Sequence, residues 1–518
     1  MTAIKPVLLL SGILGLVLLA GCAKRREPAP QITRPAAVAL SPQALLAHAQ
    51  YLAADSLAGR RAGTAGEMRA AEYIRDTFRH YGLEPAPGGY FQPFSFPDFV
   101  SLGNGNALSF TTPDHQTPVT LAPNHDFRPL GISTSKAVSG PLVFVGYGIH
   151  STDPAYNDYA GVNVSGKLVL MLTQTPAGSS AVSPFGEHRD LSVKALAARL
   201  RGAVAVLLVT GPADSQHDQL PLLRPRSTDP EAGLPMVHLT RRAADSLLAV
   251  EHLTIAQLQQ ELNRSRLPLS HIVTGVTVHI TTDLHQEQAA SRNVLAVLPG
   301  TGQLRRQLVL LGAHYDHLGL GGPGSGSAVP QRSAVHNGAD DNASGVAVML
   351  EVARYLAEHP PGNGDRRSIM FQAFGAGEPG LYGSVHAAAN LPVPMDDVTA
   401  MVNLHMVGRL DSAGLVLGGA NSSPLWLELL PALNHAGMRL QYSASGTGDH
   451  QSFLRLQIPA LSLSTGRHQQ YHHPDDDVQR LNLKGMQLVG QLVARLVQRL
   501  AVIPEPPPFI GAPPRAQR

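Results

Sequence analysis

The chain has a single cysteine, Cys22, among its 518 residues, and this excludes an intramolecular disulfide. Charged residues are also scarce, at 15% of the composition, and the 40 basic and 38 acidic side chains nearly cancel. The resulting formal net charge of +2 gives no electrostatic reason to expect a nucleic-acid partner. The length and the 43% of hydrophobic residues are enough for at least one large core and for more than one domain.

The sequence also lacks a long hydrophobic run at its N-terminus, since the apolar run over residues 7–20 is too short for a stable transmembrane helix. This run ends in "LAGC" at Cys22, which resembles the cleavage box of bacterial lipoproteins. The resemblance implies a signal peptide over 1–22, a diacylated Cys22 and a tether over 23–40. Ala23 favours the outer membrane, so we expect an exported lipoprotein of the cell envelope. A plain secretion signal with an incidental cysteine is the alternative.

The pattern of apolar residues divides the rest of the chain into three stretches. Helices are predicted from Ser41 to Ala54 and from Gly66 to Tyr81. Short β-rich runs such as "GPLVFVGYG" and "GKLVLMLTQ" follow between residues 137 and 288. We interpret 137–288 as an inserted module, although it could be part of one larger domain.

Strands and helices alternate in the third stretch, 289–503, as in "QLVLLGAHYDHL" followed by "ASGVAVMLEVARYLAEH". The strands are nearly continuous apolar runs, which is typical of a sheet covered on both faces. This pattern predicts an α/β fold, a three-layer αβα sandwich with a mostly parallel mixed sheet. Residues 41–136 would complete this domain from its N-terminal side. The proline-rich tail, 504–518, is predicted to be disordered.

Polar residues gather where these predicted strands end, and in such sheets the site lies at that edge. His314 and Asp316 close the first strand, and residues two apart point to the same side. Asp340 and Asp341 follow in "NGADDNASG". A buried pair of carboxylates needs a positive partner, and a divalent metal can supply it, although one aspartate could simply cap a helix.

Three further candidate ligands come from later loops: Glu378 in "GEPGLYGS", His405 in "VNLHMVGRL" and His472 in "YHHPDDDVQRLN". Each of these residues, taken alone, could be a solvent-exposed loop residue without a functional role. Their appearance at successive strand ends favours a metal centre.

The order of these motifs resembles the dizinc aminopeptidase family, whose distant relatives include glutamate carboxypeptidase and the transferrin receptor. The similarity covers roughly residues 41–500, and the segment "GADDNASG" is its most specific part. The inserted module likewise resembles the protease-associated domain that many members carry. The resemblance therefore implies an exopeptidase with zinc, two ions by analogy, and a peptide or protein substrate.

Carried over position by position, the resemblance assigns His314 to one zinc and Asp341 to both. Glu378 and His472 would complete the second zinc site, and Asp316 would orient His314. Asp449, in "GDHQSF", matches a family segment near the substrate pocket.

Two positions depart from the family pattern. His405 stands where the family has aspartate, which is a mild change because imidazole is also a good zinc ligand. Gly377 stands where the family has the glutamate that acts as general base, so we expect a slow or inactive enzyme with an intact metal pocket. A shifted loop could let Glu378 act as the base, but Pro379 restricts such a shift.

We therefore predict a lipid-anchored zinc exopeptidase of the aminopeptidase type, impaired by the absence of a carboxylate at Gly377. A catalytically silent protein that binds metal and peptides is the alternative, since fold and motif do not establish activity. Glutaminyl cyclisation, on the same fold, is a third and weaker hypothesis. Membrane association would come only through lipidated Cys22.

Overall fold

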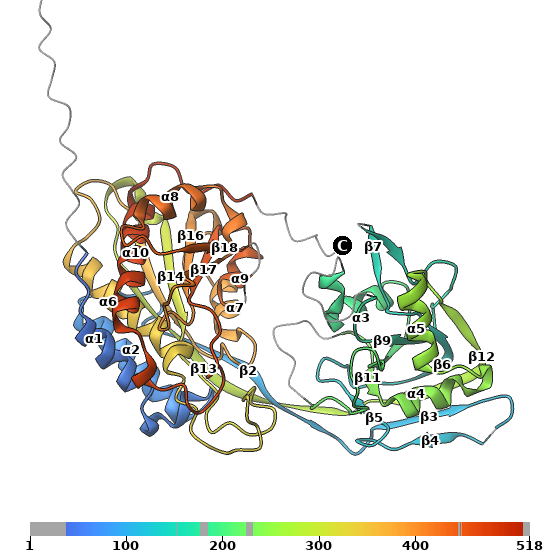
Figure 1. The fold of residues 1–518 in the computed structure, drawn as a ribbon. Coiled ribbons are helices and arrows are strands. Elements are labelled where there is room, and N and C mark those ends of the chain that lie inside the picture. Colours follow the sequence, from blue (N-terminus) through green and yellow to red (C-terminus); the bar gives the residue numbers. More distant parts are fainter. Residues whose placement is uncertain are drawn as a thin grey trace, which may run out of the picture. The chain divides into compact units, whose positions relative to one another are not determined.

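The computed structural model describes residues 38–115, 117–152, 154–176, 185–223, 232–443, 446 and 448–510. The predicted signal peptide, Cys22 and residues 23–37 of the predicted tether lie outside the described residues. Two large β-sheets organise the chain, one of nine strands and one of eight (Figure 1). Each sheet has its own buried hydrophobic cores.

The nine-stranded sheet has the order β1-β13-β15-β14-β16-β19-β17-β18, with β2 paired to β13. Its central strands β15, β14, β16 and β19 are parallel, whereas the pairs β13–β15 and β19–β17 are antiparallel. The strands are β1 (Glu84–Pro85), β2 (Phe91–Leu102), β13 (Leu284–Leu298), β14 (Leu308–His314), β15 (Ser368–Phe374), β16 (Val398–Leu404), β17 (Leu415–Gly418), β18 (Leu440–Tyr442) and β19 (Ala460–Ser464).

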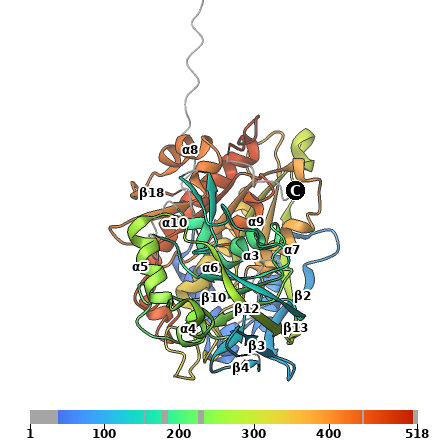
Figure 2. The same ribbon diagram turned by 90° about the vertical axis from the view of Figure 1, so that its right-hand side faces the viewer.

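Helices cover both faces of this sheet, as Figures 1 and 2 show. One face carries α1 (Pro42–Leu52), α2 (Ala65–His80), α6 (Gly345–Glu358), α8 (Leu425–Leu433) and α10 (Leu483–Val502). The other face carries α7 (Tyr382–Ala389) and α9 (His450–Leu454). The predicted three-layer αβα sandwich is confirmed. The predicted helix starts hold as well, since the Ser41 hydroxyl caps α1 by accepting from the N–H of Ala44.

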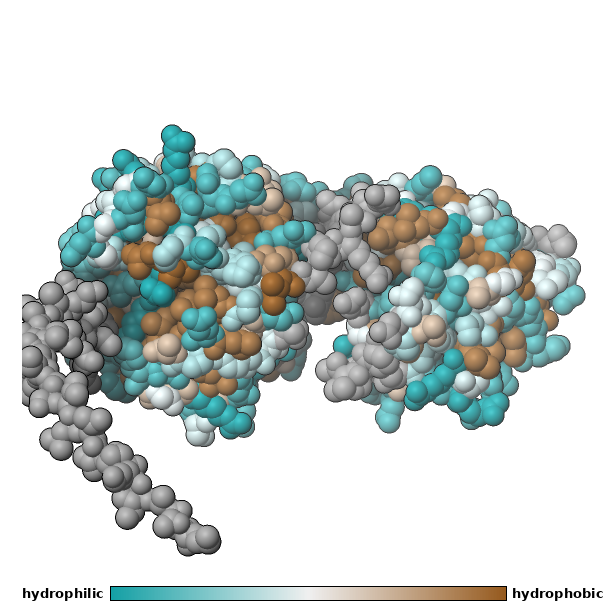
Figure 3. Space-filling view, turned by 90° about the horizontal axis from the view of Figure 1, so that it is seen from above, coloured by the Kyte–Doolittle hydropathy of each residue, from teal (hydrophilic) through white to brown (hydrophobic). Residues whose placement is uncertain are grey.

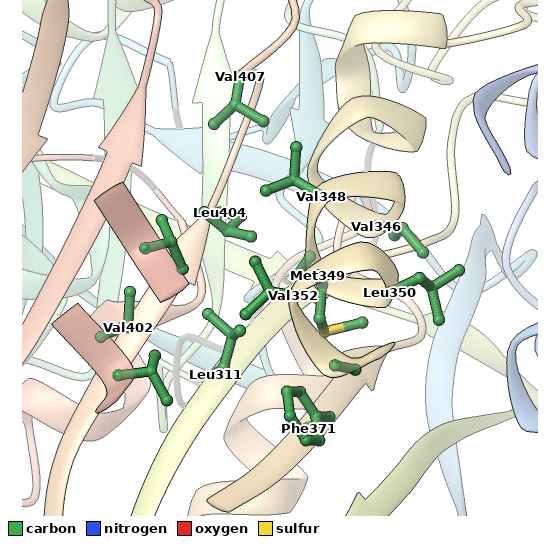
Figure 4. Close-up of a cluster of buried hydrophobic side chains, with 14 of the residues drawn as sticks. Leu311, Val346, Val348, Met349, Leu350, Val352, Phe371, Val402, Leu404 and Val407 are labelled. Carbon is green, nitrogen blue, oxygen red and sulfur yellow. The ribbon is translucent and has the colours of Figure 1, made fainter. Parts of the chain in front are cut away.

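The core between α6 and the sheet follows from the two-residue period of the strands. Leu311 of β14 points toward α6, where Val352 lies beside it (Figure 4). Leu310 packs in the hydrophobic cluster on the opposite face. Both faces of β14 are therefore apolar, and polar residues are left to its end.

The eight-stranded sheet has the order β4-β3-β12-β6-β9-β10-β11-β5. It consists of β3 (Ala107–Thr111), β4 (Val119–Leu121), β5 (Phe127–Pro129), β6 (Ala137–Phe144), β9 (Leu168–Leu172), β10 (Ala205–Val209), β11 (Met236–Leu239) and β12 (His271–Thr281). Helices α3 (Leu191–Arg199), α4 (Arg241–Leu248) and α5 (Ile255–Ser265) pack on it, and β7 (His150–Thr152) pairs with β8 (Ala155–Asn157).

This second sheet begins ahead of residue 137, the start predicted for the insertion. Strands β3, β4 and β5 already belong to it, because β3 pairs with β12 and β5 pairs with β11. The sequence obscured this because these strands are short and flanked by turns. The paired strands β2 and β13 connect the insertion to the nine-stranded sheet at both ends.

The beginning of the predicted disordered tail is ordered. Residues 504–510 are described, and the backbone N–H of Ile510 donates to the carbonyl of Ser422 at 3.0 Å. Apolar and hydrophilic residues are interspersed on the face drawn in Figure 3. Within the described ranges, every helix is too short or too polar to cross a membrane.

His48 provides a test of how α1 is held to α2. Its Nδ1 lies 2.8 Å from the hydroxyl of Tyr73, and its Nε2 lies 3.0 Å from the hydroxyl of Tyr81. Burial lowers the pKa of His48 from 6.5 to about 4. Between these values the unfolded chain binds a proton that the folded protein excludes. The free energy of unfolding should therefore fall as the pH falls through this window, by on the order of 3 kcal/mol from this residue.

His48→Gln should flatten this part of the pH dependence, because glutamine bonds but does not titrate. The measurement is urea unfolding at several pH values with chelator present, followed by the fluorescence of Trp426. This residue is the only tryptophan in the sequence and is buried in the same core. Parallel pH profiles for the parent and the variant would show that another group controls the dependence.

Candidate metal centre

The candidate ligands converge because β14, β15 and β16 are parallel, so their carboxyl ends meet at one edge. His314 is the last residue of β14, Glu378 follows β15, and His405 follows β16. A tight turn over Ala339–Ser344, just before α6, places Asp341 at this edge. The loop after β19 adds His472.

The carboxylate of Asp341 lies between two sets of side chains. Its Oδ1 is 3.4 Å from Nε2 of His314 and 3.4 Å from Nε2 of His405. Its Oδ2 is 3.3 Å from Nε2 of His472, and that nitrogen is 3.4 Å from Oε2 of Glu378. One carboxylate therefore faces two separate groups of ligand atoms.

These distances fit metal ligands better than hydrogen bonds. Two ligands that each lie about 2.0–2.1 Å from a tetrahedral zinc ion are roughly 3.3 Å apart. Ordinary hydrogen bonds of this type are shorter, near 2.9 Å. Asp341 is only 1% exposed, and neither of its oxygens has a hydrogen-bond partner within the described part of the chain. A buried carboxylate left in this state requires a cation, and the arrangement fits a divalent metal on each side.

The electrostatics of the metal-free residues agree with strong coupling around Asp341. Burial by itself would lower the pKa of His314 and of His472. Asp341 outweighs burial at His314, and Asp341 with Glu378 outweighs it at His472, so each pKa rises to about 10. Burial would raise the pKa of Asp341, and the three surrounding imidazoles instead hold it well below its usual range. A bound metal would take over the role of these protons, because zinc binds neutral imidazole.

Asp316 contacts both His314 and the loop after β15. Nδ1 of His314 lies 3.3 Å from the backbone carbonyl of Asp316 and 3.9 Å from its carboxylate. The carboxylate instead accepts hydrogen bonds from the backbone N–H groups of Gly377 (2.7 Å) and Glu378 (3.1 Å). At 3.9 Å the Asp316 carboxylate is too far from Nδ1 for a direct hydrogen bond, and the expectation that it orients His314 stays a prediction. The carboxylate holds the loop that carries Glu378, because the turn after β15 brings two N–H groups to it.

Gly377 lies against His314. A Cβ atom at position 377 would stand 2.7 Å from Cβ and 3.0 Å from Cγ of His314, and 3.2 Å from Oδ1 of Asp316. Contacts this short require the neighbouring group to move, and the Cβ of His314 is fixed to its strand. The absence of a side chain at 377 is therefore also a packing requirement of this loop.

His317 is a site residue that the sequence interpretation missed. Its Nδ1 lies 2.8 Å from Oε1 of Glu378, and the residue is 1% exposed. Ligand atoms of His317, Asp341 and Glu378 all lie within 4.8 Å of one another. A usable indication was the third polar residue of "HYDH", directly after a buried strand.

Asp449 is fully buried near the same edge, and neither carboxylate oxygen has a hydrogen-bond partner among the described residues. Burial raises its pKa, and the charges of nearby His314 and His405 oppose the rise. A cavity of about 170 Å³ opens beside His405 and is lined by Met406, Val416 and Arg467 among others. Asp449 does not line this cavity, and its place near the substrate pocket stays a prediction.

Comparison with protein families gives two matches. Residues 293–497, which contain all the candidate ligands, match peptidase family M28. Residues 138–247, within the eight-stranded sheet and its helices, match the PA domain.

Individual relatives agree with these matches. A Pseudomonas aeruginosa protein named "Aminopeptidase" is 25% identical over 368 residues, which are 70% of this chain and 56% of that protein. The chain thus spans little more than half the length of this relative. A Mycobacterium tuberculosis protein named "Probable lipoprotein aminopeptidase LpqL" is 25% identical over 491 residues, 89% of this chain and 83% of that one. The structure titled "Aminopeptidase from Aneurinibacillus sp. strain AM-1" has the same fold, with a TM-score of 0.56, 22% identity, and coverage of 92% and 96%.

Proposed function

We propose that this chain, which belongs to peptidase family M28 and carries a PA domain, is a zinc-dependent exopeptidase that removes N-terminal residues from peptides. The observation that carries the proposal is the buried carboxylate of Asp341, which faces two sets of ligand atoms at 3.3–3.4 Å. The names of the relatives support the same activity.

In this proposal His314, His405 and Asp341 hold one zinc ion, and Asp341, Glu378 and His472 hold a second. Zinc held by these residues would supply a Lewis acid for the scissile carbonyl and would lower the pKa of water to about 7. The protein residues supply the frame: Asp316 fixes the loop of Glu378, and the cavity beside His405 can accept the side chain of the substrate. The absence of a carboxylate at position 377 predicts slow turnover, because a positioned base contributes about 10²–10⁴-fold.

The test is hydrolysis of aminoacyl p-nitroanilides by the zinc-loaded and the chelator-stripped protein. We expect zinc to restore activity and to raise the melting temperature of the stripped protein, because it binds only the folded state. Asp341→Asn should abolish both effects. Asp340→Asn is the matched control, because this neighbouring buried carboxylate faces His468 instead, at 3.3 Å from Nε2.

An N-acetylated substrate should resist cleavage if the free amine is required. Zinc binding without hydrolysis of any tested anilide would contradict the proposal and favour a metal-binding protein without catalytic activity. Release of a cyclised product from a glutaminyl substrate would favour glutaminyl cyclisation.

The contact between position 377 and His314 makes a second prediction. Gly377→Ala should lower hydrolysis by about 10–100-fold, because its Cβ displaces His314 and small misplacements of this kind are costly. For the same reason Gly377→Glu should bring no gain. Gly364→Ala is the control, since its added Cβ would meet no atom within 4 Å. An increase of about 10²–10⁴-fold in Gly377→Glu would show that the loop yields and that only the base is missing.

We also propose that the protein is a lipoprotein of the cell envelope, anchored through Cys22. The LAGC sequence and the name of the Mycobacterium relative support this. Cys22→Ser should shift the protein from the membrane fraction to a soluble or unprocessed form, as seen by fractionation and immunoblotting, whereas Ala23→Ser should stay with the membrane. Membrane retention of the Cys22→Ser protein would rule out a lipid anchor on this residue.

A further inference from the structure

His317 holds the side chain of Glu378 from the side opposite His472. The imidazole follows β14, is buried, and has its Nδ1 2.8 Å from Oε1 of Glu378. The other oxygen of the same carboxylate, Oε2, is 3.4 Å from Nε2 of His472. The two oxygens of Glu378 therefore have different neighbours at different distances.

The shorter distance identifies a hydrogen bond. It is about 0.5 Å shorter than the 3.3–3.4 Å that separate the candidate ligand atoms around Asp341, and it lies in the hydrogen-bond range. An ionised carboxylate only accepts, so the Nδ1–H of His317 donates. Nε2 of His317 has no hydrogen-bond partner in the described part of the chain.

We infer that His317 is a positioning residue that donates to Oε1 of Glu378 and so presents Oε2 to the metal shared with His472. This inference rests on the zinc site of the proposed function. The backbone of Glu378 is already held by Asp316, but its side chain needs a second anchor. Without it, the side chain can rotate away from the metal position, because Glu378 is partly exposed.

The segment His314–His317 therefore serves both halves of the metal centre. His314 offers its ring to one metal position, Asp316 fixes the backbone of the loop after β15, and His317 fixes the ligand that this loop carries. Outer hydrogen bonds of this kind orient ligands and typically contribute 10–100-fold to metal affinity.

The test compares His317→Asn with His317→Leu. The amide nitrogen of asparagine can take the place of Nδ1 and donate, whereas leucine fills the space without a donor. Zinc affinity is measured at fixed pH by competition with a chromophoric chelator, and the fold is checked by the melting temperature of the metal-free protein. We expect His317→Leu to bind zinc about 10–100-fold more weakly and His317→Asn to stay within a few-fold of the parent.

His336→Leu is the control for loss of a buried imidazole, because His336 is fully buried but bonds Ser327 and the carbonyl of Ala334. Equal weakening in the asparagine and leucine variants would overturn the inference and make His317 a direct ligand. Unchanged affinity in His317→Leu would also overturn it. These outcomes are read from zinc affinity alone, so they are independent of whether the parent hydrolyses peptides.

Discussion

The burial of the Asp341 carboxylate is the constraint on which the rest of this site depends. An ionised carboxylate that is 1% exposed is costly unless charges or hydrogen bonds compensate it. Three imidazoles, one from the end of β14 and two from separate loops, converge on it and are arranged on its two sides. Any change that moves Asp341 therefore disturbs every other ligand. The site behaves as one unit and not as a set of independent contacts.

The backbone around Asp341 is held by a second layer of buried charges. Oδ2 of Asp476 accepts from the N–H groups of Asp340 (2.9 Å) and Asp341 (3.1 Å), and Arg409 donates to Oδ1 of Asp476 at 3.0 Å. The loop after β19 thus supplies both the ligand His472 and the acceptor that fixes Asp341. A second cation, Arg60, is fully buried and donates to the carbonyls of Leu52, Tyr315, Asn337 and Gly338. Its charge lies among the carboxylates of the site while its hydrogen bonds join α1 to the ends of the site loops.

The parts of the site that could be predicted from sequence are the candidate metal ligands, because metal binding requires particular residue types. Asp341, Glu378 and His472 occur in specific motifs at successive strand ends, and the three-layer fold follows from apolar strands alternating with amphipathic helices. The start of the insertion could not be placed, because the pairing of β3 with β12 joins residues that are far apart in the chain. Likewise, the sequence gives the residue types of His317 and Asp316 but does not give their roles. Only distances distinguish an imidazole 2.8 Å from Glu378 from one that binds metal, or show that Asp316 bonds the loop.

Glycine at position 377 has two separate consequences, one for the chemistry of the site and one for its packing. In the sequence it marks the loss of a carboxylate from a family motif, and a glutamate there looks like a simple repair. In the structure its α-carbon faces His314, at a distance that leaves no room for a β-carbon. Both consequences involve the neighbouring candidate ligand, His314. The N–H of Gly377 donates to the carboxylate of Asp316 at 2.7 Å. The loop then depends on Asp316 and His317 to hold Glu378, because those are the contacts that fix it. Restoring the base in this chain therefore requires more room at His314, and not only a new carboxylate.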